Sequence, residues 1–236
     1  MQTKYRPRFA AKDLPVLYED KDLLIVDKPV GLLSVATERE KTWTVHSLLT
    51  EYIRKGAGRS KKRIFIVHRL DRDTSGLLIF AKSEEAMLRL KERWKETEKK
   101  YLAVVHGRLE KDSGTITSYL AEDEDYTMYS TAGNEGKLAR TAYRVMKETS
   151  RYSLIEVTLL TGRKNQIRVH MAEIGHPVVG DIRYGKPGDE NQPRMALHAR
   201  SLSFQHPFIR RQISIVSEVP EFFVKLVGKI EGEVGP

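Results

Sequence analysis

The chain has 236 residues, of which 40% are hydrophobic and 31% charged, with a formal net charge of +9 and no cysteine. This size and composition indicate a folded protein with a proper core. The lack of cysteine excludes disulfides and thiolate metal sites, and no apolar run approaches the roughly 20 residues that a membrane helix needs. The basic excess favours a polyanionic partner, and the absence of a secretory signal or a cysteine predicts a cytoplasmic location.

Short apolar runs separated by polar turns predict ten strands along the chain. They are expected at residues 16–18, 23–26, 64–67, 77–81, 101–105, 114–120, 140–146, 152–160, 195–204 and 212–216. The first two should form a hairpin through the turn at 19–22. These strands mostly follow one another through short connections, which is typical of an antiparallel or mixed sheet.

Four helices are expected between the strands. Residues 45–53 have apolar side chains at helical spacing, with Thr44 as a plausible N-cap and Gly56 as the end. Ser83 should cap a second helix with a buried stripe of Met87, Leu90 and Trp94. Residues 166–174 and 221–230 predict the other two. The fold class predicted is α+β, a single domain with a largely antiparallel or mixed central β-sheet flanked by helices, and not a doubly wound nucleotide-binding fold.

A polar loop lies between the third and fourth expected strands. Its sequence from His68 to Gly76 is His-Arg-Leu-Asp-Arg-Asp-Thr-Ser-Gly. Asp71 and Asp73 are, in the simplest interpretation, turn residues of a charged hairpin loop. They also fit the Asp-x-Asp-x-Thr pattern of Mg²⁺-dependent phosphatases. That second pattern fits poorly because His68 and Arg69 separate the strand from the first aspartate, and no later acidic pair completes a metal site.

A strongly basic segment precedes this loop. Residues 54–63 contain six cations, two glycines and no anion. The segment is either a solvated linker or a clamp for phosphate groups, and its place next to the polar loop favours the clamp.

Five segments, in order over about 190 residues, resemble the motifs of the RluA-type pseudouridine synthases. The polar loop and the strand after it resemble the family's signature. Residues 19–32 are similar to its opening strand and lysine–proline turn, and 100–107 to its tyrosine strand. Residues 160–170 are similar to its arginine motif and 194–207 to its closing strand. The match implies the pseudouridine synthase fold.

The resemblance implies an enzyme that isomerises specific uridines in structured RNA to pseudouridine, with no cofactor and no metal. Large-subunit ribosomal RNA is the preferred target and transfer RNA the alternative. No membrane and no obligate protein partner are expected. Residues 1–13 are expected to be a basic tail and 14–236 the catalytic domain, with no separate N-terminal RNA-binding domain. A non-catalytic RNA-binding protein remains the alternative from another class.

The resemblance assigns three catalytic residues. Asp71 is the essential carboxylate, which either attacks C1′ of the uridine or removes the C2′ proton. Arg168 is expected to hold Asp71 ionised and oriented, and Tyr101 to stack on the uracil. Asn165 departs from the family, which usually has histidine there. The residues expected to bind RNA are His68, Arg69, Thr74, Arg163, Asn165, Gln166, Lys61, Lys62 and Arg63.

Overall fold

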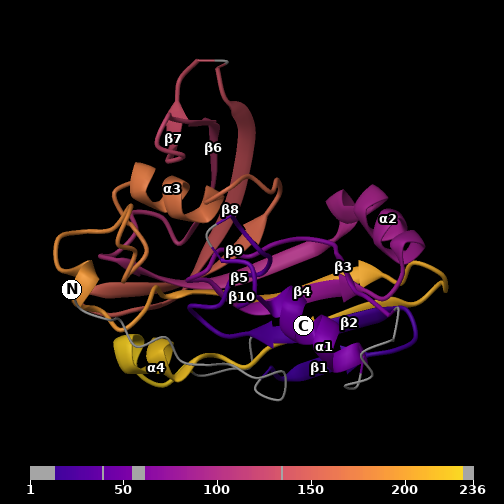
Figure 1. The fold of residues 1–236 in the computed structure, drawn as a ribbon. Helices are drawn as coiled ribbons and strands as arrows, with labels where there is room; N and C mark the ends of the chain where they lie inside the picture. The colour runs from indigo at the N-terminus through magenta and orange to yellow at the C-terminus, as the bar shows by residue number, and fades with distance from the viewer. Residues whose placement is uncertain (1–13, 39, 55–61, 134, 231–236) are drawn as a thin grey trace.

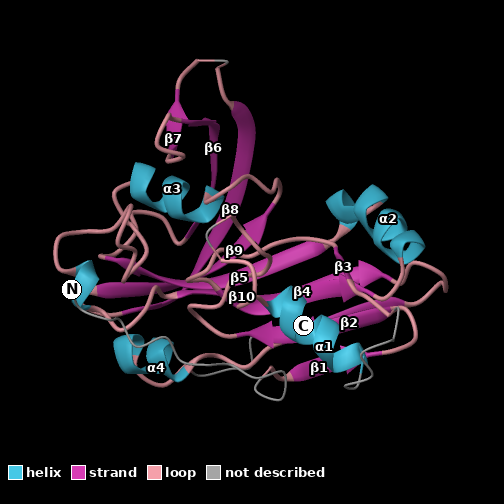
Figure 2. Cartoon of the chain, in the orientation of Figure 1, coloured by secondary structure: helices cyan, strands magenta, loops and turns pink. Residues whose placement is uncertain are grey.

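The structure is a computed structural model that describes residues 14–38, 40–54, 62–133 and 135–230. Within these residues one 11-stranded sheet forms the body of the protein. Helices lie on both of its sides, as Figures 1 and 2 show. The predicted α+β fold class is therefore confirmed. None of the helices in the described segments is long and apolar enough to cross a membrane.

The strands are more numerous than the helices and alternate with them irregularly. The strands are β1 Val16–Glu19, β2 Leu23–Lys28, β3 Phe65–Ile66, β4 Ser75–Ala81, β5 Glu98–His106, β6 Ser113–Glu122, β7 Met128–Thr131, β8 Lys137–Glu148, β9 Tyr152–Leu159, β10 Leu197–Gln205 and β11 Gln212–Val216. The α-helices are α1 Val45–Arg54, α2 Glu84–Glu92, α3 Gln166–Glu173 and α4 Glu221–Val227. Two single 3₁₀ turns, η2 Trp94–Glu96 and η3 Asp189–Asn191, complete the described elements.

The sheet has the order β1-β2-β4-β10-β5-β9-β8-β6-β7, with β3 beside β4 and β11 beside β10. Its pairs are antiparallel except β4 with β10, which is parallel. Strand β10 comes late in the chain yet enters the middle of the sheet, where Ala199 pairs with Gly76 on one side and Tyr101 on the other. The polar loop before β4 and the tyrosine strand β5 thereby meet at one place. Strands β6, β7 and part of β8 rise away from the body beside α3 (Figure 1).

The central strands are buried on both faces, which explains their continuous apolar sequences. In β4, Leu78 and Phe80 belong to the larger core, which α1, α3 and α4 help to form. Leu77 and Ile79 face the smaller core under α2. Successive side chains of a strand point to opposite faces, so one short strand stabilises both layers.

The structure corrects several expected details. Strand β7 was not predicted, and α4 ends at Val227 instead of residue 230. Ser83 does cap α2, since its hydroxyl accepts a 3.1 Å hydrogen bond from Ala86 N. However, α2 ends at Glu92, so Trp94 lies in the following 3₁₀ turn, and the fully buried helix residues are Ala86 and Leu90. The expected tail at residues 1–13 and Gly56 lie outside the described residues.

Candidate active site

The polar loop between β3 and β4 is held on both sides of Asp71. The Ser34 hydroxyl donates to Leu70 O at 2.7 Å and accepts from Leu70 N at 3.0 Å. Gly31 N donates to Arg72 O at 2.9 Å. Both peptide neighbours of Asp71 are therefore fixed by the turn after β2, and this fixes the direction of the Asp71 side chain.

A fully buried lysine, Lys28, completes this support. Its Nζ lies 2.8 to 3.0 Å from three carbonyl oxygens, those of Leu32, Pro29 and Arg72. Burial lowers the pKa of Lys28 to about 7, although the negative charges of Asp73 and Asp71 act in the opposite direction. A buried ammonium is tolerated here because all three of its donor hydrogens are used.

Gly76, at the start of β4, lets β10 approach the loop closely. Its φ is +108°, and a Cβ atom placed on it would lie 2.3 Å from Ala199 O. Any side chain would therefore push β10 away. Next to it, Ser75 Oγ and His198 Nδ1 form a buried 2.9 Å hydrogen bond between the same two strands.

The structure brings together the three residues for which a catalytic role was predicted. Arg168 Nη1 on α3 lies 3.4 Å from Asp71 Oδ2. The Asp71 side chain is 37% exposed and that of Arg168 11%. Tyr101 on β5 is buried, and burial, followed by the nearby charge of Asp71, raises its pKa above the ordinary value. A partly exposed carboxylate thus lies beside a guanidinium, and its charge acts on a buried tyrosine.

Asp71 is not the main partner of Arg168. Arg168 Nε and Nη2 donate to the two carboxylate oxygens of Asp181 at 2.7 and 2.8 Å, and the Asp181 side chain is completely buried. Burial opposes both charges, but the hydrogen bonds and charges of the pair dominate. They raise the pKa of Arg168 and lower that of Asp181. Sequence reasoning missed Asp181, whose signal is only an acid in the loop after α3.

Comparisons with known proteins identify the family of the chain. A family model described as RNA pseudouridylate synthase matches residues 22–173, which include Asp71, Tyr101 and Arg168. The chain belongs to this family. It is 37% identical over 218 residues to the uncharacterized RNA pseudouridine synthase YlyB of Bacillus subtilis (strain 168), covering 91% of this chain and 72% of that protein. The enzymes of this family are isomerases, so the chain is placed among isomerases and not among phosphatases.

The chain is also similar to a second bacterial enzyme and to a solved human structure. The chain is 36% identical over 229 residues to ribosomal large subunit pseudouridine synthase D of Nitrosomonas europaea, covering 92% of this chain and 65% of that one. The solved structure of human RNA pseudouridylate synthase domain containing 4 matches with a TM-score of 0.77 and 24% identity, covering 91% of this chain and 92% of the other. The latter similarity supports the pseudouridine synthase fold.

The residues of this pseudouridine synthase that were predicted to contact RNA differ in their exposure to solvent. Arg69 is exposed, but Thr74 is buried. The His68 ring stacks on Trp94 with 4.7 Å between centroids, and its Nε2 accepts from Ile79 N at 3.2 Å. Burial lowers the pKa of His68 to about 3. His68 therefore holds the loop against the smaller core as a neutral ring, and its contact with RNA stays a prediction.

The predicted RNA contacts before and at the start of α3 also include both exposed and buried residues. Arg163 is exposed, and its Nε donates to Leu138 O at 3.1 Å. Gln166 is buried, and its amide is fully engaged with protein atoms, those of Thr161, Arg163, Arg140 and Thr141. Asn165 has a left-handed φ of 53°, and its Oδ1 accepts from Arg168 Nη1 at 3.2 Å. Asn165 thus contacts Arg168 directly, and its predicted contact with RNA stays a prediction.

The basic segment is only partly described. Lys61 lies outside the described residues, whereas Lys62 and Arg63 are exposed at the end before β3. The Arg63 guanidinium lies 5.8 Å from the ring centroid of Phe65. Both cations stay predicted RNA contacts.

A cavity of about 600 Å³ lies beside the Asp71–Arg168 pair. Arg168, Asp181 and Asp73 line the side that it shares with the site. Trp43, Met195 and Arg194 line other parts of it. The cavity therefore offers an aromatic ring, apolar surface and cations next to Arg168.

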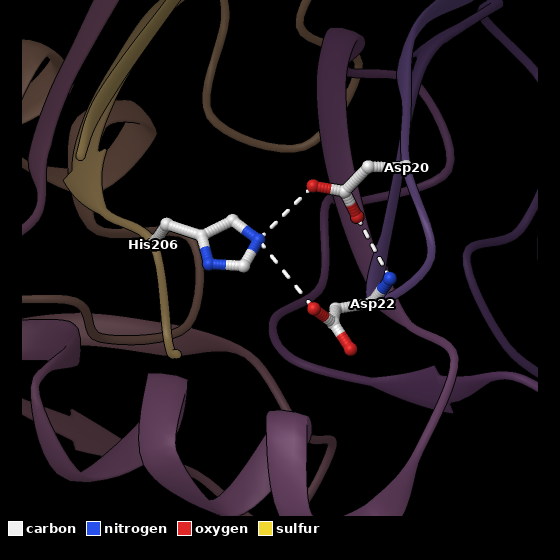
Figure 3. A group of neighbouring side chains, drawn as sticks. All are labelled: Asp20, Asp22 and His206. Atoms are coloured by element: carbon white, nitrogen blue, oxygen red, sulfur yellow. Dashed lines mark hydrogen bonds and ion pairs between the residues drawn. The ribbon is translucent and has the colours of Figure 1, made fainter. Parts of the chain in front are cut away.

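A second cluster of acids and histidine, shown in Figure 3, includes the β1–β2 turn, at the other end of β2 from this site. His206 Nε2 is 3.0 Å from Asp20 Oδ2 and 3.8 Å from Asp22 Oδ2. Its Nδ1 accepts from the backbone N–H groups of Phe208 and Ile209, so the ring proton resides on Nε2 and is donated to Asp20. Metal binding through Nε2 would move this proton to Nδ1, which faces two N–H donors, so the cluster instead ties the β1–β2 turn to the end of β10.

Proposed function

We propose that the chain converts uridines of large-subunit ribosomal RNA to pseudouridine, with Asp71 as the reacting carboxylate. The contact that carries the proposal is the 3.4 Å pair of Asp71 and Arg168, inside the segment that matches the family. The similarity to a ribosomal large subunit pseudouridine synthase supports ribosomal RNA over transfer RNA.

The reaction rearranges one nucleotide without exchange of groups with another reagent. The N1–C1′ bond breaks, the uracil turns, C5 bonds to C1′, and the C5 proton is lost while N1 gains one. Asp71 either attacks C1′ or takes the C2′ proton, and each route requires the carboxylate anion. Arg168 attracts and orients that anion. Its own charge is balanced by Asp181, so the contact with Asp71 stays long enough to leave the carboxylate accessible.

Tyr101 fits a stacking role better than a basic one. Its raised pKa means that the hydroxyl keeps its proton near neutral pH. A protonated phenol donates hydrogen bonds and offers an apolar ring face, but it does not accept the C5 proton. We therefore assign Tyr101 to holding the uracil while it turns.

The uridine must leave its stack to reach Asp71, which favours loops and bulges as targets. Exposed Arg69 lies two residues before Asp71 and is available to occupy the space that the base leaves. The cavity of about 600 Å³ has room for a neighbouring nucleotide. Trp43 in its lining offers a ring for that nucleotide, because aromatic rings stack on any base. Exposed Lys62, Arg63 and Lys91 extend the basic surface.

The test is pseudouridine formation on purified ribosomal and transfer RNA by wild type, Asp71→Asn and Asp73→Asn. We expect activity on large-subunit RNA that EDTA leaves unchanged, a loss of about a thousandfold or more for Asp71→Asn, and retained activity for Asp73→Asn. Mapping of pseudouridines in a deletion strain identifies the position. Substantial turnover by Asp71→Asn would overturn the catalytic assignment, and modification of transfer RNA alone would overturn the target.

A further inference from the structure

The guanidinium of Arg168 is held in one plane by several acceptors. Two N–H groups bind Asp181, and Nη1 donates to both Asn165 Oδ1 at 3.2 Å and Asp71 Oδ2 at 3.4 Å. Four contacts therefore engage a group with five N–H donors. The Asp181 pair sets the plane, and Asn165 is the described side chain that shares Nη1 with Asp71.

Asn165 is in turn held by a tyrosine from the loop after α3. Arg168 has only donors, so the Asn165 carbonyl must face it and the amide NH₂ must point the other way. That amide donates to the Tyr184 hydroxyl at 3.2 Å. The Tyr184 ring lies 5.0 Å from the Arg168 guanidinium carbon, so the tyrosine supports the arginine through its face as well.

The Tyr184 hydroxyl is anchored to the hairpin that rises beside α3. Met128 N, at the start of β7, donates to it at 3.0 Å. Arg183 Nη1 donates to Thr127 Oγ1 at 2.9 Å, so the same turn is bound at two adjacent points. The Tyr184 ring also packs in a small cluster with Val169 and Met128. A path of direct contacts thus leads from the β6–β7 turn through Tyr184 and Asn165 to Arg168.

We propose that Asn165 and Tyr184 are positioning residues that anchor Nη1 of Arg168 to the β6–β7 turn and so keep it directed at Asp71. The proposal rests on the proposed function, because it concerns the same reacting carboxylate. It also gives a role to the departure at position 165. Asparagine adopts the left-handed conformation required there, and its amide offers one acceptor and one donor on opposite sides. In this proposal Asn165 acts through its bonds to Arg168 and Tyr184 and not through the RNA contact predicted for it, so the effect is on the rate of the step and not on RNA affinity.

The experiment compares Tyr184→Phe, Asn165→Gly and the double variant under single-turnover conditions, with RNA affinity measured separately. Phenylalanine keeps the ring packing and removes the hydroxyl, and glycine removes the side chain while tolerating a positive φ. Tyr129→Phe is the matched control, because that half-exposed tyrosine lies on the same hairpin and its hydroxyl bonds to none of the described residues. Asn165→His is the conservative variant, since imidazole both accepts and donates.

We expect each single variant to lower the single-turnover rate about tenfold, the value of one lost hydrogen bond, with the RNA dissociation constant within about twofold of wild type. The double variant should lose about tenfold and not about a hundredfold, because both changes break one path. Asn165→His should recover most of the rate, and Tyr129→Phe should match wild type. Additive losses, loss of RNA binding instead of rate, or wild-type rates in Tyr184→Phe would overturn the proposal. If the wild-type protein itself forms no pseudouridine, the proposed function fails instead.

Discussion

Substitution of Asp181 and of Asp71 by asparagine should separate stability from catalysis. Asp181 is completely buried and forms two short hydrogen bonds with Arg168, while Asp71 is 37% exposed and forms one long contact. Breaking a buried ion pair costs about 3–5 kcal/mol because the remaining charge is left buried. Asparagine keeps one oxygen as an acceptor, so we expect about 3 kcal/mol for Asp181→Asn. Asp71→Asn should change stability by less than about 1 kcal/mol.

The assay is urea unfolding at pH 7, followed by tryptophan fluorescence, with both variants and wild type in parallel. The depressed pKa of Asp181 gives the sign of a second readout. The contribution of the Asp181 carboxylate to the free energy of unfolding is fully present above the pKa of an unfolded aspartate, near 4. It is lost as the pH falls through the lower pKa that Asp181 has in the folded protein. The stability gap between wild type and Asp181→Asn should therefore narrow in acid. A larger destabilisation for Asp71→Asn than for Asp181→Asn would refute this division of roles.

Two further predictions concern the supports of the loop. Gly76→Ala should lower the free energy of unfolding in urea by more than about 2 kcal/mol, because its Cβ would meet Ala199 O. Gly31 also has a positive φ but faces open space, so Gly31→Ala should lower it by only about 1 kcal/mol. Equal losses for the two variants would contradict this reasoning. Lys28 has a pKa lowered by burial to about 7, so between this value and the unfolded value near 10.5 only the unfolded chain holds the proton. The free energy of unfolding of wild type should therefore rise with pH over that range, relative to that of Lys28→Met, by up to about 1.4 kcal/mol per pH unit. Unfolding of both proteins between pH 7.5 and 9.5 measures this difference. Equal pH slopes of the two free energies would disprove the prediction.

Most of the sheet could be predicted from the sequence because its strands are marked by local patterns. Both-face burial makes β4 a continuous apolar run, and Ser83 marks the start of α2 by a bond to a residue three positions away. Strand β7 could not be found in this way. Its four residues carry one buried side chain, and its pairing with β6 depends on the hairpin and not on an apolar pattern.

In the candidate site, too, local motifs could be predicted from the sequence and long-range contacts could not. Asp71, Tyr101 and Arg168 lie in recognisable motifs, but the bonds that hold them join residues far apart in sequence. Lys28 binds Arg72 O across 44 positions, and no local pattern reveals that its ammonium is buried. Gln166 also shows the limit, because its motif indicates function while its amide is used to fix the chain before α3. Motifs show which residues matter, and only the packing shows which of them reach the substrate.

The two carboxylates around Arg168 explain how a positive charge can serve the proposed reaction without blocking it. If Asp71 were the close partner, its oxygens would be held in a tight pair and screened from the ribose. Asp181 instead takes the two short bonds, at 2.7 and 2.8 Å, and leaves Asp71 the contact at 3.4 Å. The guanidinium remains charged and fixed. Its electric field therefore acts on Asp71 without any rearrangement of Arg168 when the substrate binds. In the proposed reaction, the buried Asp181 thus keeps the partly exposed Asp71 available.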